Sequence, residues 1–165
     1  MLGSFSSFAE SYVCTVPKSR RFATDRWSLE LPDGMAAQVV GAPPECTSMV
    51  HIRGDIAPGA PAVVIVTSQA LRDSTVHTRA RQLAASLRTA TEPRPIDVPG
   101  TSRSLRVDGL VEVEEGLADD WIERIAIVVA VRGNEVIGLA ARTRTGDDVA
   151  GAVEALIASF AIRRV

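Results

Sequence analysis

The chain has 165 residues, of which 46% are apolar and 23% charged, and its formal net charge is −2. These values are typical of one globular domain with a substantial core, and they exclude an extensively disordered chain. The near-neutral charge also argues against broad binding to nucleic acid or acidic membranes, because both need a concentrated basic face. No apolar run approaches the ~18 residues of a transmembrane helix.

The N-terminal residues differ in character from the rest of the chain. Residues 1–26 mix serines, arginines and scattered apolar residues, and we expect a partly ordered arm there, followed by a single α+β domain over residues 27–165. Residues 1–10 have neither a basic n-region nor a long apolar h-region, so they do not resemble a secretory signal. The sequence therefore favours a cytoplasmic protein without a membrane span.

The first half of the expected domain is rich in strands. Residues 27–31 alternate apolar and polar side chains before the turn signal Pro32-Asp33-Gly34. Short strands are expected around 37–40 and 49–53, between glycine and proline breakers. The β-branched run at 62–67 predicts a strand that is buried on both faces.

Residues 73–90 change to a helical period. The apolar side chains recur at i, i+4, i+7 and i+11, which predicts a helix with one buried stripe formed by Val76, Ala80, Leu83 and Leu87. Asp73, Ser74 or Thr75 can cap its start, and Pro93 is expected to end it.

The next segment, 103–114, alternates between apolar and charged side chains. Leu105, Val107, Val111 and Val113 share one parity, and the other, which we expect to face water, carries Arg106, Asp108, Glu112 and Glu114. A single long, half-exposed strand with a bend at Gly109 explains this alternation. The alternative is a hairpin that turns at Asp108-Gly109.

Residues 122–143 form the clearest predicted element, a hairpin around Gly133-Asn134, which suits a two-residue primed turn. The implied register pairs Ile127 with Ala140 on one face and Ala126 with Ala141 on the other. Both faces are apolar through the middle of the hairpin, so it must be covered on both sides and belongs in the centre of a three-layer structure.

A second helix is expected near the C-terminus. Its stripe repeats the earlier spacing at Val149, Val153, Leu156 and Phe160. Thr145, Asp147 and Asp148 supply N-terminal caps and favourable dipole charge, and residues 160–165 can form a last strand. The predicted fold class is α+β, a three-layer α/β/α sandwich around a mainly antiparallel sheet with a central hairpin.

This order of elements resembles the PsbP-like superfamily, which includes DcrB-like proteins, Mog-type proteins and actinobacterial lipoproteins. The resemblance covers about Trp27 to Ile162 and is carried by the strand before Pro32-Asp33-Gly34, the lone mid-chain helix, the Gly-Asn turn and a last helix ending in Ala158-Ser159-Phe160. It implies an α/β/α sandwich and a binding or accessory role without a shared catalytic site. The chain has no lipobox cysteine near Met1, and no functional residue is carried over.

Catalytic and metal-binding signals are absent from the sequence. His51 and His77 are the only histidines, and with Cys14 and Cys46 they show no metal-ligand spacing. No serine lies in a Gly-x-Ser-x-Gly elbow, and the glycine-containing loops lack a phosphate-binding pattern. We therefore expect no catalytic residue, metal or cofactor, and we interpret the cysteines as packing residues or free thiols.

One surface feature of the mid-chain helix is a candidate binding site. His77, Arg81 and Arg88, which we call the basic strip, lie within about 40° of one another on the helical wheel, beside the apolar stripe. Arginines on one face can pair with carboxylates of an acidic protein or with an anion. The alternative is an ordinary solvated helix face.

The leading functional hypothesis is a non-enzymatic protein-interaction or accessory module, a monomer or homodimer that binds an acidic protein partner and neither nucleic acid nor membrane. The alternative is a small-molecule or lipid-binding module with a pocket between sheet and helix, and an enzyme of unrecognised type is a third possibility. A large apolar pocket with a few convergent polar groups would favour the second hypothesis.

Overall fold

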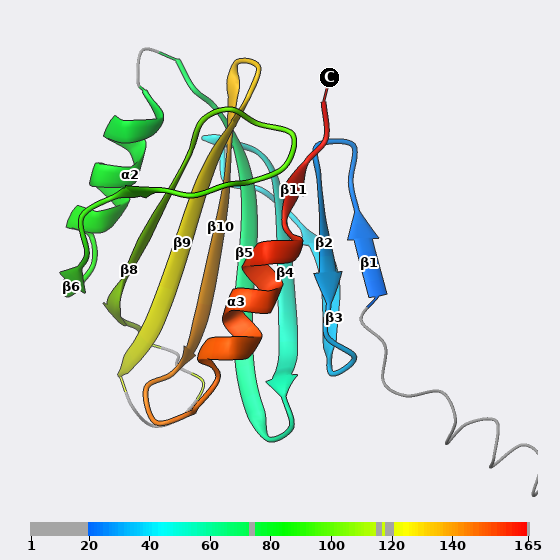
Figure 1. Ribbon diagram of the computed structural model, residues 1–165, viewed down its shortest axis with the longest axis vertical. Coiled ribbons are helices and arrows are strands. Elements are labelled where there is room, and N and C mark those ends of the chain that lie inside the picture. Colours follow the sequence, from blue (N-terminus) through cyan, green and yellow to red (C-terminus); the bar gives the residue numbers. More distant parts are fainter. Residues whose placement is uncertain (1–19, 73–74, 115–116, 118–120, 165) are drawn as a thin grey trace, which may run out of the picture.

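The computed structural model describes residues 20–72, 75–114, 117 and 121–164 (Figure 1). Its central sheet has eight strands in the order β3-β4-β5-β10-β9-β8-β6, and β7 pairs with β8 beside this path. All strand pairs in this sheet are antiparallel. The strands are β3 (Met35–Val40), β4 (Cys46–Ala57), β5 (Ala60–Ala70), β6 (Thr89–Ala90), β7 (Arg94–Pro95), β8 (Ser104–Glu112), β9 (Ile122–Arg132) and β10 (Glu135–Arg144).

One face of the sheet is covered by a layer of mixed composition. Helix α3 (Ala150–Ser159) lies in it together with a small antiparallel sheet of β1 (Arg20–Ala23), β2 (Trp27–Leu31) and β11 (Ala161–Ile162). The larger hydrophobic core lies beneath this layer, where Trp27, Leu29 and Phe160 are almost fully buried. Part of the predicted N-terminal arm, residues 20–23, is therefore strand β1 of this layer, and residues 1–19 lie outside the described range.

The opposite face carries helix α2 (Val76–Ala85), which packs on β8 and β9 over a second core. The predicted three-layer α+β sandwich is thus confirmed. The expected burial of residues 62–67 on both faces is only partly right: Val64 and Val66 are fully buried under the α3 layer, but Ile65 on the α2 side is half-buried. The reason is that α2 lies over β8 and β9 and not over β5.

The central hairpin is confirmed in its predicted register. Ile127 pairs with Ala140 and Ala126 with Ala141 across the Gly133-Asn134 turn. Side chains of β9 alternate between the two cores, as two covered faces require. Strand β8 is one continuous strand paired with β9, so the alternative turn at Asp108-Gly109 is wrong.

Both helices depart from prediction at one end. Thr75 caps α2 as expected, its hydroxyl accepting a hydrogen bond from the Thr78 amide at 3.1 Å. The helix ends at Ala85 and not before Pro93, because the Arg88 amide donates to the Leu110 carbonyl and the chain joins the sheet as β6.

The predicted cap of the C-terminal helix by Thr145, Asp147 or Asp148 is wrong. Val149 takes the N-cap position of α3 and makes no side-chain capping bond. Asp147 instead accepts a hydrogen bond from Arg144 Nε at 2.8 Å, which fixes the link between β10 and α3. Neither α2 nor α3 is long and apolar enough to cross a membrane, and the described residues contain no other helix that could.

Candidate functional site

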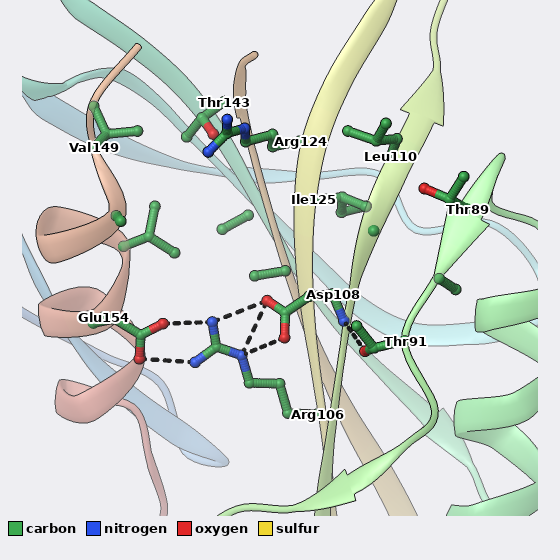
Figure 2. Close-up of a pocket in the computed structure, with 16 residues that line it drawn as sticks. Thr89, Thr91, Arg106, Asp108, Leu110, Arg124, Ile125, Thr143, Val149 and Glu154 are labelled. Carbon is green, nitrogen blue, oxygen red and sulfur yellow. Dashed lines mark hydrogen bonds and ion pairs between the residues drawn. The ribbon is translucent and has the colours of Figure 1, made fainter. Parts of the chain in front are cut away.

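A cavity of about 540 Å³ opens between α3 and the central sheet (Figure 2). Helix α3 packs mainly against β2 and β4, so it leaves part of β8, β9 and β10 on this face without a cover. Small-molecule sites in proteins have volumes of roughly 300–1,000 Å³. This cavity is therefore large enough to enclose a small molecule.

The floor of the cavity consists of neighbouring rows of side chains that the strand register brings together. Directly opposed residues in antiparallel strands share a face, with Cβ atoms about 4.5–5.5 Å apart. The outer row contains Leu110, Arg124 and Thr143, and the middle row Asp108, Ala126 and Ala141. The centre is hollow because two alanines stand where most strand positions carry larger side chains.

The walls come from elements on either side of this floor. One wall is formed by Val149, the N-cap of α3, and by Ala150, Val153 and Glu154 of the helix. The other wall is the edge of the sheet, where Thr89, Ala90 and Thr91 run along β8. The lining is therefore mostly apolar, with polar groups at its two ends.

The inner end is closed by an ion-pair network around Arg106, whose side chain is buried (Figure 2). Its Nη2 and Nε atoms donate to Asp108 at 2.9 and 3.1 Å, and Nη1 donates to Glu154 of α3 at 2.8 Å. Asp108 also pairs with Arg94 of β7 at 3.2 Å. The network thus ties α3, β7 and β8 together at one end of the cavity.

The network shifts the titration of Arg106 and Glu154 in the expected directions. The hydrogen bond with Glu154 raises the pKa of Arg106 above its ordinary value, against the opposing effect of burial. The same hydrogen bond lowers the pKa of Glu154. All three guanidinium nitrogens of Arg106 are occupied, so this cation has no free donor edge for a ligand.

The outer end presents Arg124 and Thr143. Arg124 is exposed and has no hydrogen-bond or ion-pair partner in the described part of the chain, while Thr143 is buried with 3% of its surface accessible. The two residues are cross-strand partners, and Figure 2 shows the guanidinium turned toward Thr143. Of the two cations that line the cavity, Arg124 is the one available for binding.

The residues of the predicted basic strip lie elsewhere. His77 and Arg81 are exposed one turn apart on α2, on the other side of the sheet. Arg88 follows the end of the helix and pairs with Glu112 at 3.2 Å, so its place on the same helical face is wrong. None of the three lines the cavity.

The sequence pattern does not identify the residues of the cavity as a site. We expect Arg106 and Asp108 to face water, but in the structure Arg106 is buried, Asp108 is half-buried, and Glu154 of α3 binds Arg106. The predicted hairpin register, when extended toward the open ends of the strands, does place Arg124 opposite Thr143. What it lacks is the position of α3 above them.

The other candidate residues form no reactive cluster. His51 lies half-exposed on β4, and neither it nor His77 hydrogen-bonds to a serine or a carboxylate within the described residues. Cys46 is a free thiol, and Cys14 lies outside the described range. The same residues contain no group of three potential metal ligands. What the arrangement does offer is a binding cavity with an apolar middle.

Comparisons with known proteins bear on the fold. No family model and no curated protein matches the chain. It is similar in structure to cyanobacterial PsbP (CyanoP) from Synechocystis sp. PCC 6803, with a TM-score of 0.51 and 16% identity over 89% of this chain and 94% of that one. A Bacteroides thetaiotaomicron structure gives a TM-score of 0.55 and 9% identity, over 89% of this chain and 49% of that one. LpqN, involved in cell envelope biogenesis of Mycobacterium tuberculosis, gives a TM-score of 0.49 and 13% identity over 87% and 84%. The chain therefore has the PsbP-like fold that its order of elements implied.

Proposed function

We propose that the chain is a non-enzymatic binding module that takes a small amphipathic molecule into the cavity beside α3. One observation carries this proposal: a cavity of about 540 Å³ combines an apolar middle with a free cation at its mouth. Binding sites for small molecules are mostly apolar, with a few polar groups that fix orientation. This arrangement supports the small-molecule alternative more than the protein-interaction hypothesis.

The alanine pair in the floor gives the proposal a direct test. Ala141 is buried under the α3 layer and lines the cavity, whereas Ala140, the next residue of β10, points to the opposite face and lines a smaller groove of about 280 Å³ beside α2. An Ala141→Leu variant fills the cavity, and Ala140→Leu is a matched control on the other face. Both changes add the same atoms to the same strand.

The probe should be uncharged, so that the test concerns the cavity and not its charged mouth. We expect the fluorescence of N-phenyl-1-naphthylamine to rise on binding the wild-type protein, because the dye moves into an apolar site. Ala141→Leu should abolish this rise and Ala140→Leu should leave it. Loss of the signal only in Ala140→Leu would place the dye in the groove beside α2, and absence of a signal from the wild type would refute the proposal.

A further inference from the structure

We infer, on the basis of the proposed function, that the ligand is a monocarboxylate with an apolar body, bound with its carboxylate on Arg124 and Thr143. The charges at the two ends of the cavity carry this inference. Arg124 is the only lining cation without a partner among the described residues, and it lies at the mouth. The cavity therefore has one end that attracts an anion.

The chemistry at the mouth fits one carboxylate. A guanidinium presents a planar pair of N–H donors that matches the two oxygens of a carboxylate. Thr143, opposite Arg124 in the register, adds a hydroxyl within the same cavity. On the other side of Arg124 lies Leu110, which offers no polar group. A single carboxylate would occupy the donors present.

The rest of the cavity selects for an apolar body. From the outer row the ligand would pass over Ala126 and Ala141, with Val149 at the N-cap of α3 and Val153 of the helix beside it. Arg124 pairs with Leu110 of β8, and Arg106 lies four residues before Leu110 on the same strand. At about 3.3 Å per residue, the two rows are about 13 Å apart. This distance sets the length of chain that the floor can accommodate.

The inner end argues against a second carboxylate. All three guanidinium nitrogens of Arg106 already bond Asp108 or Glu154. A second anionic group would meet the oxygens of these two carboxylates without a free cation. Burial of an unpaired charge is costly, so dicarboxylates should be excluded.

The test compares three probes with the same number of carbon atoms: octanoate, 1-octanol and octanedioate. Isothermal titration at low ionic strength should give octanoate an affinity about tenfold or more above that of octanol, because charged hydrogen bonds are stronger than neutral ones. Octanedioate should bind more weakly than octanoate. The octanoate advantage should fall in high salt, since Arg124 is exposed to solvent.

Arg124→Gln should remove the advantage of octanoate and leave the affinity for octanol unchanged. Arg53→Gln is the matched control, because Arg53 is an exposed arginine of β4 that does not line the cavity. Equal binding of octanoate and octanol to the wild type, or an advantage that survives Arg124→Gln, would overturn the carboxylate inference while leaving the cavity as a binding site. If neither compound nor the neutral dye binds, both the inference and the proposed function fail.

Discussion

Replacement of Arg106 by methionine tests whether the buried network holds α3 and β7 against the sheet. Methionine keeps much of the volume of the arginine stem but removes the guanidinium and its bonds to Asp108 and Glu154. The matched control is Arg94→Met, because Arg94 also pairs with Asp108, at 3.2 Å, but its side chain is 53% exposed. The two variants remove the same functional group from a buried and an exposed position.

The magnitude follows from how far each partner can return to water. The Arg106 side chain is 8% exposed, but those of Asp108 and Glu154 are 30% and 59% exposed, so both carboxylates rehydrate when the cation is lost. The full ~3–5 kcal/mol for breaking a buried pair therefore does not apply. We expect Arg106→Met to lower the free energy of unfolding by about 1–2 kcal/mol, and Arg94→Met by less than ~0.5 kcal/mol.

Urea unfolding followed by circular dichroism at neutral pH measures both differences. The pH dependence supplies a second readout. The hydrogen bond with Arg106 lowers the pKa of Glu154, so its contribution is present above the ordinary glutamate pKa and is lost as the pH falls through the lowered value. The difference between wild type and Arg106→Met should shrink below about pH 4. Equal losses in the two arginine variants, or a difference that does not change with pH, would refute this account.

Three further predictions concern packing and surface charge. Leu156→Ala should lower the free energy of unfolding by ~2–5 kcal/mol, because Leu156 is 2% exposed. Leu83→Ala should lower it by less, because Leu83 is only half-buried in the core beneath α2. Equal losses in denaturant melts would contradict the assignment of the two cores. Gly109→Ala should destabilise the protein and expose the β6 amides to hydrogen exchange, because an added Cβ would meet the Thr89 carbonyl oxygen; unchanged exchange would contradict this. A folded His77→Glu/Arg81→Glu variant should lose any acidic protein partner that co-purifies with the wild type from the native host, and full recovery of every partner would leave these residues a solvated face.

The elements that sequence reasoning predicted best are those whose hydrophobic pattern is compatible with only one structure and one register. The hairpin around Gly133-Asn134 has a turn signal and a two-faced pattern, and its register is as predicted. The end of α2 was predicted less well. Leu87 continues the helical stripe, and in the structure it packs in the same core from beyond the helix end. A stripe identifies the buried side of a segment, and it does not show where backbone bonds leave the helix for the sheet.

The site could be predicted only in part, because it depends on contacts between elements far apart in the sequence. Arg106 and Glu154 are 48 residues apart, and no local pattern joins a strand to a helix at that separation. Alternation correctly put Arg106 on the face opposite Val107. It could not show that Glu154 of α3 reaches Arg106 on this face, since the position of α3 follows from its packing on β2 and β4.

The alanine pair in the cavity floor leads to a last prediction that separates stability from binding. Ala126 and Ala141 face each other in the middle of the central sheet, although alanine is a poor strand former and fills little space. Positions whose residues go against strand preference and close packing in this way are expected to serve function at some cost in stability. An Ala126→Val/Ala141→Val variant should therefore raise the free energy of unfolding.

The expected gain follows from apolar volume and strand preference. Each valine adds two methyl groups to a cavity that is already open, and burial contributes about 0.8 kcal/mol for each such group, so partial burial of four groups gives about 1–3 kcal/mol in total. The same variant should lose the fluorescence response to N-phenyl-1-naphthylamine, because the added methyl groups occupy the space of the dye. Denaturant melts and dye titrations on one preparation measure both effects. A loss of stability would mean that the alanines are needed for close packing against α3, and would contradict the assignment of the hollow as a binding site.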